Sequence, residues 1–179
     1  MKYVAALLSV ALASASLEVL HPLEPASDAP ESWLQVCCQD NDKNDDGGIS
    51  FREFMPFVLQ ILDIDRKGLS DIFLAGDVDR NSDLDGNECP VIRSKLREKM
   101  TEKVSKALKE YDSDGDSKLS QDEIQKLASQ DFKLEAKEAD AVSVNLSAPV
   151  SGDRLPELLI ELRARQIEHF GGKKVTPRP

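Results

Sequence analysis

The sequence predicts an all-α fold built from repeated helix–loop–helix units. Charged residues make up 31% of the chain and aromatic residues only 5%, a mix that suits helices better than a β-sandwich. Three acidic stretches start at Asp42, Asp77 and Asp112, a constant period of 35 residues. Each stretch is flanked by apolar residues at helical spacing. A constant period of this length indicates one supersecondary unit that is repeated along the chain.

The first residues, MKYVAALLSVALASAS, have the pattern of a secretory signal peptide. Lys2 gives a short positive segment, an apolar run follows, and Ala13-Ser14-Ala15 has the small residues of a cleavage site. We therefore expect a signal peptide over residues 1–16, a linker over 17–31 and a secreted, extracellular protein. An N-terminal core helix is the alternative interpretation. No later segment is apolar for the length of a membrane span, so we expect none.

The register of the first acidic stretch, DNDKNDDGGISFREF, can be tested residue by residue. Counting from Asp40 puts Phe51 at the twelfth place, and counting from Asn41 puts Lys43 at the third place. Neither residue supplies a side-chain oxygen. Counting from Asp42 puts oxygen-bearing side chains at the first, third, fifth, ninth and twelfth places, namely Asp42, Asn44, Asp46, Ser50 and Glu53. The other two stretches have the same pattern, with Ile or Leu always at the eighth place.

This pattern resembles the EF-hand, the calcium-binding unit of the calmodulin-like superfamily, over most of residues 32–170. The resemblance implies three Ca²⁺ ions, each held by carboxylate, amide and carbonyl oxygens and closed by a bidentate glutamate. In the first loop, 42–53, it implies Asp42, Asn44, Asp46, the carbonyl of Gly48, and Glu53. In the second, 77–88, the implied ligands are Asp77, Asp79, Asn81, the carbonyl of Asp83, and Glu88. In the third, 112–123, they are Asp112, Asp114, Asp116, the carbonyl of Lys118, and Glu123. Ser50, Asp85 and Ser120 would each hold a water.

The sixth place of such a loop needs a positive φ, which glycine adopts most easily. Only Gly47 fits this rule, because Ser82 and Ser117 occupy the other two sixth places. A non-glycine residue in that conformation costs about 1 kcal/mol. We therefore expect the first loop to be the least strained of the three.

EF-hands pair through a short β-contact at their eighth residues, so a fourth unit is expected. We predict one lobe over 32–95 and a second over 96–170, which holds the third loop and a degenerate fourth hand. Leu155 is placed at its eighth position, which makes the loop start at Ala148 and puts Leu159 at the twelfth place, where a ligand belongs. The alternative is an ordinary C-terminal helix. Residues 171–179 are predicted to be a disordered basic tail.

A long helix is predicted from Pro90 to Tyr111, where the chain has no further Gly or Pro. Its many cations form either a solvated face balanced by nearby glutamates or a contact for an acidic partner or matrix. Apolar residues around the first two loops are expected to be core residues: Phe51, Phe54, Phe57, Val58, Ile61, Leu62, Ile72, Phe73 and Ala75.

Three cysteines leave at most one internal bridge. In paired EF-hands the positions of Cys38 and Cys89 lie close together, so Cys38–Cys89 is a disulfide candidate, with Cys37 as the competing partner. The triplet Asn145-Leu146-Ser147 is a glycosylation sequon.

The formal net charge of −10 argues against nucleic acid as a partner. The spacing of the three EF-hand-like loops already accounts for the paired carboxylates, so we do not expect an enzyme. Three hypotheses compete for the function. The first is an extracellular calcium buffer or component of a calcified, biomineral matrix. The second is a calcium-dependent sensor that binds a partner protein. The third is an ER-lumenal calcium handler, which the C-terminal sequence VTPRP argues against.

Overall fold

The computed structural model describes residues 41–171, and this part of the chain is mostly helical, which confirms the all-α class. In chain order the elements are β1 (Ile49–Ser50), α1 (Phe51–Ile61), α2 (Arg66–Gly76), β2 (Asp83–Leu84), α3 (Cys89–Tyr111), β3 (Lys118–Leu119), α4 (Gln121–Gln130), α5 (Ala136–Asn145), β4 (Val150–Ser151) and α6 (Leu155–Phe170). The predicted signal peptide and linker, Cys37, Cys38 and the tail from residue 172 lie outside the described residues.

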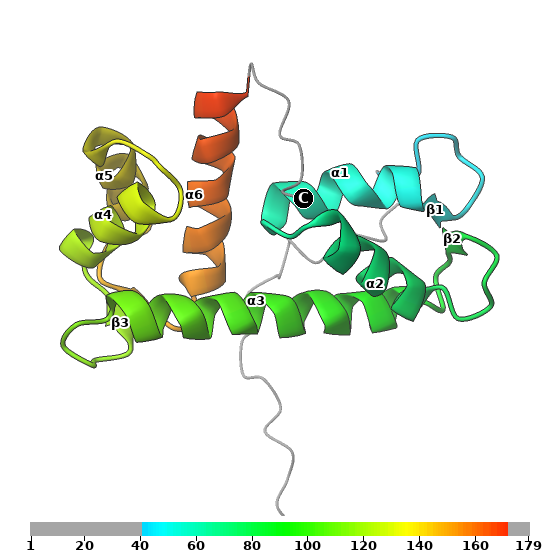
Figure 1. Ribbon diagram of the computed structural model, residues 1–179, viewed down its shortest axis with the longest axis horizontal. Coiled ribbons are helices and arrows are strands. Elements are labelled where there is room, and N and C mark those ends of the chain that lie inside the picture. Colours follow the sequence, from blue (N-terminus) through cyan, green and yellow to red (C-terminus); the bar gives the residue numbers. More distant parts are fainter. Residues whose placement is uncertain (1–40, 172–179) are drawn as a thin grey trace, which may run out of the picture.

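Two short antiparallel sheets lie at opposite ends of α3 (Figure 1). In the first sheet Ile49 pairs with Leu84, which confirms the predicted contact between the eighth residues of the first two loops. In the second sheet Leu119 pairs with Val150. Each sheet therefore joins two segments that connect helices.

The pairing of Leu119 with Val150 corrects the prediction that Leu155 is the partner residue. Leu155 is the first residue of α6, and Pro156 follows it in the first helical turn. A residue in a helix cannot extend a β-ladder, whereas the β-branched Val150 suits a strand. The loop is therefore shifted by five residues relative to the predicted register, and its twelfth place falls on Arg154.

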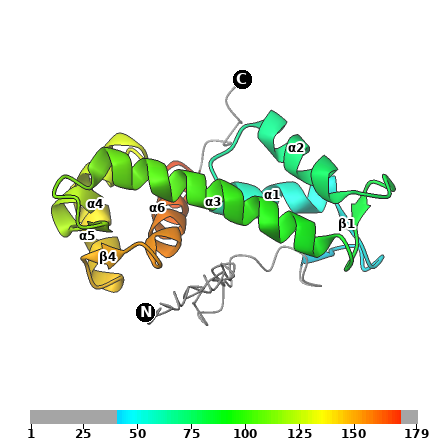
Figure 2. The ribbon, with the colours of Figure 1, turned by 90° about the horizontal axis from the view of Figure 1, so that it is seen from below.

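Helix α3 is continuous and connects the two halves of the molecule, as the sequence predicts (Figures 1 and 2). Its 23 residues give it a length of about 35 Å. Ile92 and Leu96 are buried in the half that contains α1 and α2, and Ala107 and Tyr111 are buried further along. One helix thus supplies core residues to both ends.

The core of the first half surrounds Phe73, which touches the rings of Phe51 and Phe54 at centroid distances of 5.2 and 5.5 Å. Ala75 was predicted to be a core residue, but it is exposed. The buried face of α2 instead continues to Gly76, where an added Cβ would lie 2.3 Å from Ile92 Cδ1. Gly76 thus lets α2 approach α3 closely.

The two halves also contact each other through α6, which packs against both α1 and α3 (Figure 1). Arg163 of α6 donates from Nε to the carbonyl oxygen of Leu59 at 3.4 Å. No helix in the described part of the chain has the length and apolar character of a membrane span.

Candidate metal centre

The three acidic loops of the sequence lie at the two ends of the molecule. The first and second loops lie side by side where β1 pairs with β2, and the third lies beside β3 at the far end of α3 (Figure 1). The loops themselves carry the same internal hydrogen bonds at equivalent places.

The first aspartate of each loop accepts a hydrogen bond from the main-chain N–H five residues later. The donors and acceptors are Gly47 N to Asp42 Oδ2 at 2.9 Å, Ser82 N to Asp77 Oδ2 at 3.1 Å and Ser117 N to Asp112 Oδ2 at 2.9 Å. This contact turns the chain back on itself, so that alternate side chains of the loop face the same side.

The third and fifth side chains accept hydrogen bonds in the same way from N–H groups two residues later. For the third place the bonds are Asp46 N to Asn44 at 3.2 Å, Asn81 N to Asp79 at 3.0 Å and Asp116 N to Asp114 at 3.2 Å. For the fifth place they are Gly48 N to Asp46 at 3.1 Å, Asp83 N to Asn81 at 2.8 Å and Lys118 N to Asp116 at 2.8 Å. Each of these side chains is thus oriented by the loop backbone.

The glutamate at the twelfth place closes each loop. Its Oε1 accepts from the N–H of the second residue: Lys43 to Glu53 at 2.9 Å, Val78 to Glu88 at 2.6 Å and Ser113 to Glu123 at 2.7 Å. Its Oε2 accepts from the N–H of the ninth residue: Ser50 at 3.0 Å, Asp85 at 3.2 Å and Ser120 at 2.9 Å. Both carboxylate oxygens are therefore held inside the loop.

These hydrogen bonds favour the charged form of Glu53 and Glu123. The Ser50 hydroxyl and main-chain N–H lower the pKa of Glu53, and the main-chain N–H groups of Ser113 and Ser120 lower the pKa of Glu123. The carboxylates at these closing positions are thus poised to stay ionised.

Ser50 and Ser120 have a role that our sequence prediction missed. They are the N-cap residues of α1 and α4, and their hydroxyls donate to Glu53 Oε2 at 2.6 Å and to Glu123 Oε2 at 2.8 Å. The Ser-x-x-Glu spacing at 50–53 and 120–123 is the signature of a capping box and could have predicted this. The glutamates therefore start a helix as well as close a loop.

The sixth residue of each loop has a positive φ, as predicted. The angle is 89° at Gly47, 76° at Ser82 and 62° at Ser117. The fourth residues also have positive φ, which was not predicted: 59° at Asp45, 61° at Arg80 and 75° at Gly115. The period of 35 residues is thus repeated in backbone conformation as well as in composition. Two left-handed residues per loop give these loops their tight curvature.

Two of the loops bring three carboxylates together. Within residues 41–171, one carboxylate oxygen from each of Asp77, Asp79 and Glu88 lies within 4.8 Å of the others, and the third loop gathers Asp112, Asp114 and Asp116 in the same way. Asp77 is buried, and its Oδ1 is the one buried side-chain polar atom in the described residues without a hydrogen-bond partner.

The first loop does not form such a cluster, although it was expected to be the least strained. Asn44 Nδ2 donates to Asp46 Oδ2 at 2.7 Å and thereby occupies one of its carboxylate oxygens. The positive φ of Gly47 at the sixth place is thus not sufficient to bring three carboxylates together.

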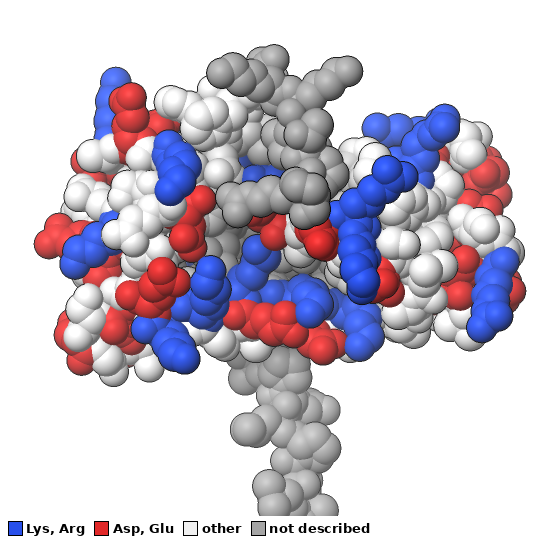
Figure 3. Space-filling view, in the orientation of Figure 1, with Lys and Arg blue, Asp and Glu red and all other residues white. Residues whose placement is uncertain are grey.

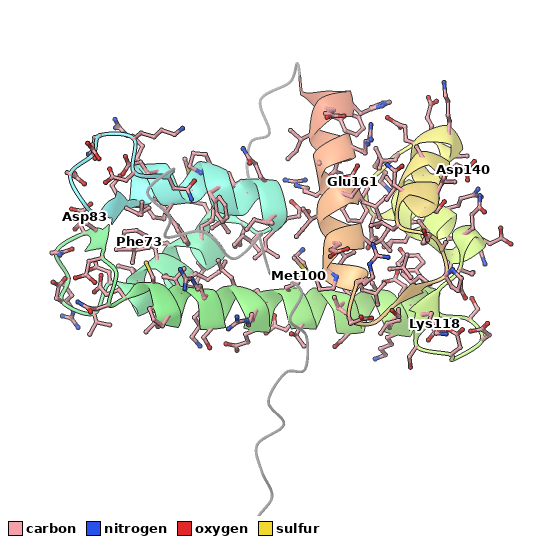
Figure 4. The ribbon with its side chains drawn as sticks, turned by 180° about the vertical axis from the view of Figure 1, so that it is seen from behind. Phe73, Asp83, Met100, Lys118, Asp140 and Glu161 are labelled. Carbon is pink, nitrogen blue, oxygen red and sulfur yellow. The ribbon has the colours of Figure 1, made fainter. Side chains whose placement is uncertain are left out.

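Asp83 belongs to the second loop and lies beside the first loop, because it pairs with Ser50 across the short sheet (Figure 4). Burial raises the pKa of this carboxyl, and the negative charges of Asp46, Glu53, Asp77 and Asp42 raise it further. A Cβ added at Gly48 would lie 2.9 Å from Asp83 Cβ. Gly48 is thus required by the close approach of the two loops, in addition to its predicted carbonyl role.

The fourth loop, between α5 and α6, is closed by a cation. Arg154 occupies the place equivalent to the closing glutamates, and its Nη1 donates to the carbonyl oxygen of Leu146 at 3.0 Å. At the first place, the hydroxyl of the buried Ser143 donates to the carbonyl oxygen of Asp140 at 2.9 Å. This loop therefore pairs with the third without an acidic cluster of its own.

The remaining predicted positions are the glycosylation sequon and the disulfide candidates. Asn145 is exposed at the end of α5. Cys89 is buried at the start of α3, and because Cys37 and Cys38 lie outside the described residues, the Cys38–Cys89 bridge stays a prediction.

No family model matches the sequence, and no curated protein matches it. The geometry of the loops therefore carries the functional argument alone.

Proposed function

We propose that this protein binds calcium through three EF-hand-type loops. The observation that carries the proposal is the buried carboxylate of Asp77: its Oδ1 has no hydrogen-bond partner, and one of its two oxygens lies within 4.8 Å of carboxylate oxygens from Asp79 and Glu88. Three carboxylates at this separation repel one another, and a buried oxygen without a donor is costly. A bound cation would remove both penalties.

The chemistry of the loops favours Ca²⁺ among cations. Every predicted ligand is an oxygen, and hard cations prefer carboxylate and carbonyl oxygens to nitrogen or sulfur. A closing glutamate whose two oxygens both face the loop suits the six to eight ligands of Ca²⁺ better than the octahedron that Mg²⁺ demands. The repeated hydrogen bonds support the same ligand set in all three loops.

The proposed ligands are those that the EF-hand resemblance implies. They are Asp42, Asn44, Asp46, Gly48 and Glu53 in the first loop, Asp77, Asp79, Asn81, Asp83 and Glu88 in the second, and Asp112, Asp114, Asp116, Lys118 and Glu123 in the third. Gly48, Asp83 and Lys118 would contribute main-chain carbonyl oxygens. Arg154 closes the fourth loop, which we assign to pairing alone.

We further propose that the protein acts outside the cell as a calcium buffer or as a component of a calcified matrix. Extracellular calcium is abundant, and a ligand at 100 times its Kd stabilises a protein by about 2.7 kcal/mol per site. Calcium would then be permanently bound and would contribute to stability. A sensor of a calcium signal would instead need sites that empty and fill.

The proposal is tested by thermal unfolding with calcium and with a chelator. We expect calcium to raise the Tm of the wild-type chain, and Glu53→Gln, Glu88→Gln and Glu123→Gln each to remove part of that rise. Glu168→Gln is the matched control, because it removes the same charge from an exposed position of α6. An unchanged Tm in calcium would reject the proposal.

Two further measurements separate the competing roles. Binding of an apolar dye that increases strongly on calcium addition would favour the sensor. Recovery of the protein from conditioned medium, and not from the ER, would favour the extracellular role.

A further inference from the structure

A cavity of about 190 Å³ lies where α6 meets α1, α3 and the end of α4, away from the acidic loops. Three cations line it: Lys103 and Lys106 of α3 and Arg163 of α6. Figure 3 shows Lys and Arg side chains, with Asp and Glu side chains among them, around the hollow between the two halves of the molecule. In a protein of net charge −10, such a concentration of positive charge needs an explanation.

Four of the five lysines of α3 divide into two groups. Lys95 and Lys99 are paired with glutamates one turn away, Glu98 at 3.0 Å and Glu102 at 2.8 Å, so their charges are balanced on the helix surface. Lys103 instead donates to a neutral acceptor, the main-chain carbonyl of Asp63, at 2.9 Å. Lys106 forms no ion pair with another described residue. The second group is the one that faces the cavity.

Arg163 is the most buried of the three cations, with 5% of its surface exposed. Its hydrogen bonds go to neutral groups, the carbonyl of Leu59 and the side chain of Gln166. Its one carboxylate partner, Asp63, is 3.5 Å away and has a side chain that is 62% exposed. A buried guanidinium whose one counter-charge is largely exposed to solvent is incompletely compensated.

The acids at the cavity do not balance the cations. Asp63 and Asp131 are the acidic residues that line it, and Asp131 already accepts a hydrogen bond from the Tyr111 hydroxyl at 3.1 Å. Burial lowers the pKa of Lys103, and the positive charges of Arg163 and Lys106 oppose its protonation further, although Asp63 and Asp131 act in the other direction. Three cations against two carboxylates leave the lining of the cavity with a net positive charge.

The geometry points to a binding site for a small inorganic oxyanion, such as phosphate or carbonate, between Lys103, Lys106 and Arg163. An arginine supplies several N–H donors in a fixed plane and suits oxyanions, and two lysines add mobile point charges. The volume exceeds that of engineered cavities of about 150 Å³ that bind benzene, so a hydrated ion of this size fits. The apolar wall, which includes Leu127 and Leu159, strengthens the attraction by excluding water.

The test is an NMR titration of the full chain with inorganic phosphate in calcium-free buffer, with bicarbonate as the second arm and chloride as the non-specific reference. We expect saturable amide shifts around Lys103 and Arg163 with one or both oxyanions and none with chloride. Lys106→Met should weaken binding about tenfold, because a charge-assisted hydrogen bond is lost. Lys109→Met is the matched control, since it removes the same charge from an exposed position of α3 that does not line the cavity, and it should change the affinity by less than about twofold.

Linear, non-saturable amide shifts would contradict the proposed oxyanion site. An equal loss of oxyanion affinity in Lys106→Met and Lys109→Met would also contradict it. Lys103→Met gives a second, independent variant if Lys106→Met alters the fold. Because calcium is absent from the titration, its outcome does not depend on the proposed calcium sites.

Discussion

The Asp77 carboxylate and the Ser82 main chain hold the second loop in a tight turn. Asp77 Oδ2 accepts the Ser82 N–H at 3.1 Å, while Ser82 itself has a φ of 76°. The same hydrogen bond leaves Asp77 Oδ1 buried and unpartnered beside two other carboxylates. The backbone strain of this loop therefore lies at Ser82, and Asp77 takes part in the electrostatic repulsion. Each can be altered by a single substitution.

Asp77→Asn should stabilise the calcium-free protein and weaken its response to calcium. One of three mutually repelling carboxylates is removed, which we expect to raise the free energy of unfolding without calcium by about 1 kcal/mol. The increase in the free energy of unfolding on addition of calcium should be smaller by the contribution of one site. Urea unfolding in chelator and in calcium measures both. Asp45→Asn is the control, because Asp45 is exposed in the first loop and is not a proposed ligand. A loss of stability in chelator would contradict the repulsion argument.

Ser82→Gly should increase the free energy of unfolding by about 0.5–1 kcal/mol, because glycine adopts a φ of 76° without the steric cost that serine bears. Ser117→Gly should act in the same direction. Ser113→Gly serves as the control in the third loop, since its φ is not positive. Glycine there adds freedom to the unfolded chain and removes the hydrogen bond from the Ser113 hydroxyl to the Tyr111 carbonyl oxygen at 3.2 Å, so this variant should be destabilised. If all three substitutions destabilise equally, the turn residues are not strained.

Gly48→Ala should destabilise the protein by about 1–3 kcal/mol, because its new Cβ would lie 2.9 Å from Asp83 Cβ and force the first two loops apart. Gly86→Ala is the matched control: no atom lies within 4 Å of a Cβ at that position, and its φ is not positive. Calcium binding by both the first and second loops should weaken in Gly48→Ala. Equal stability of the two variants would show that the loops do not approach each other so closely.

The pKa of Tyr111 should lie well above that of an ordinary tyrosine. Burial, together with the hydrogen bond to Asp131, raises the pKa of Tyr111 to about 12. The folded state therefore holds the phenolic proton more tightly than the unfolded state, whose value is about 10. This contribution to stability is fully present below about pH 10 and is lost as the pH rises through about 12.

Near-ultraviolet absorbance of the phenolate checks this in a Tyr3→Phe background, where Tyr111 is the one remaining tyrosine. Absorbance that rises with a midpoint near 10 while the protein is still folded would contradict the buried environment.

The loops could be predicted from sequence because their determinants are local. The oxygen side chains at alternate places and the closing glutamate lie within twelve residues, and the hydrogen bonds of the structure follow that spacing. The recurrence of this pattern every 35 residues made it recognisable. The positive φ at Ser82 and Ser117 was predictable for the same reason, since loop curvature fixes it.

The fourth loop was placed in the wrong register because it has no acidic pattern to fix the count. Leu155 and Val150 are both apolar, and the sequence alone did not show that helix α6 begins at Leu155. Ala75 was misplaced for a related reason, because the side of α2 that is buried depends on how it crosses α3 at Gly76.

The cation-lined cavity could not be predicted from the sequence. It depends on Arg163 lying against residues about one hundred positions earlier, where Leu59 accepts its hydrogen bond. No periodicity in the chain encodes the packing of α6 against α1, because that contact is fixed by the way both halves pack along α3.

Calorimetric titration of the mature, metal-free protein with calcium is the most direct test of the central claim. We predict saturable binding of three ions per chain, and two ions per chain in Glu88→Gln. An absence of saturable binding, or a wild-type stoichiometry that Glu88→Gln leaves unchanged, would contradict the assignment of these loops as calcium sites.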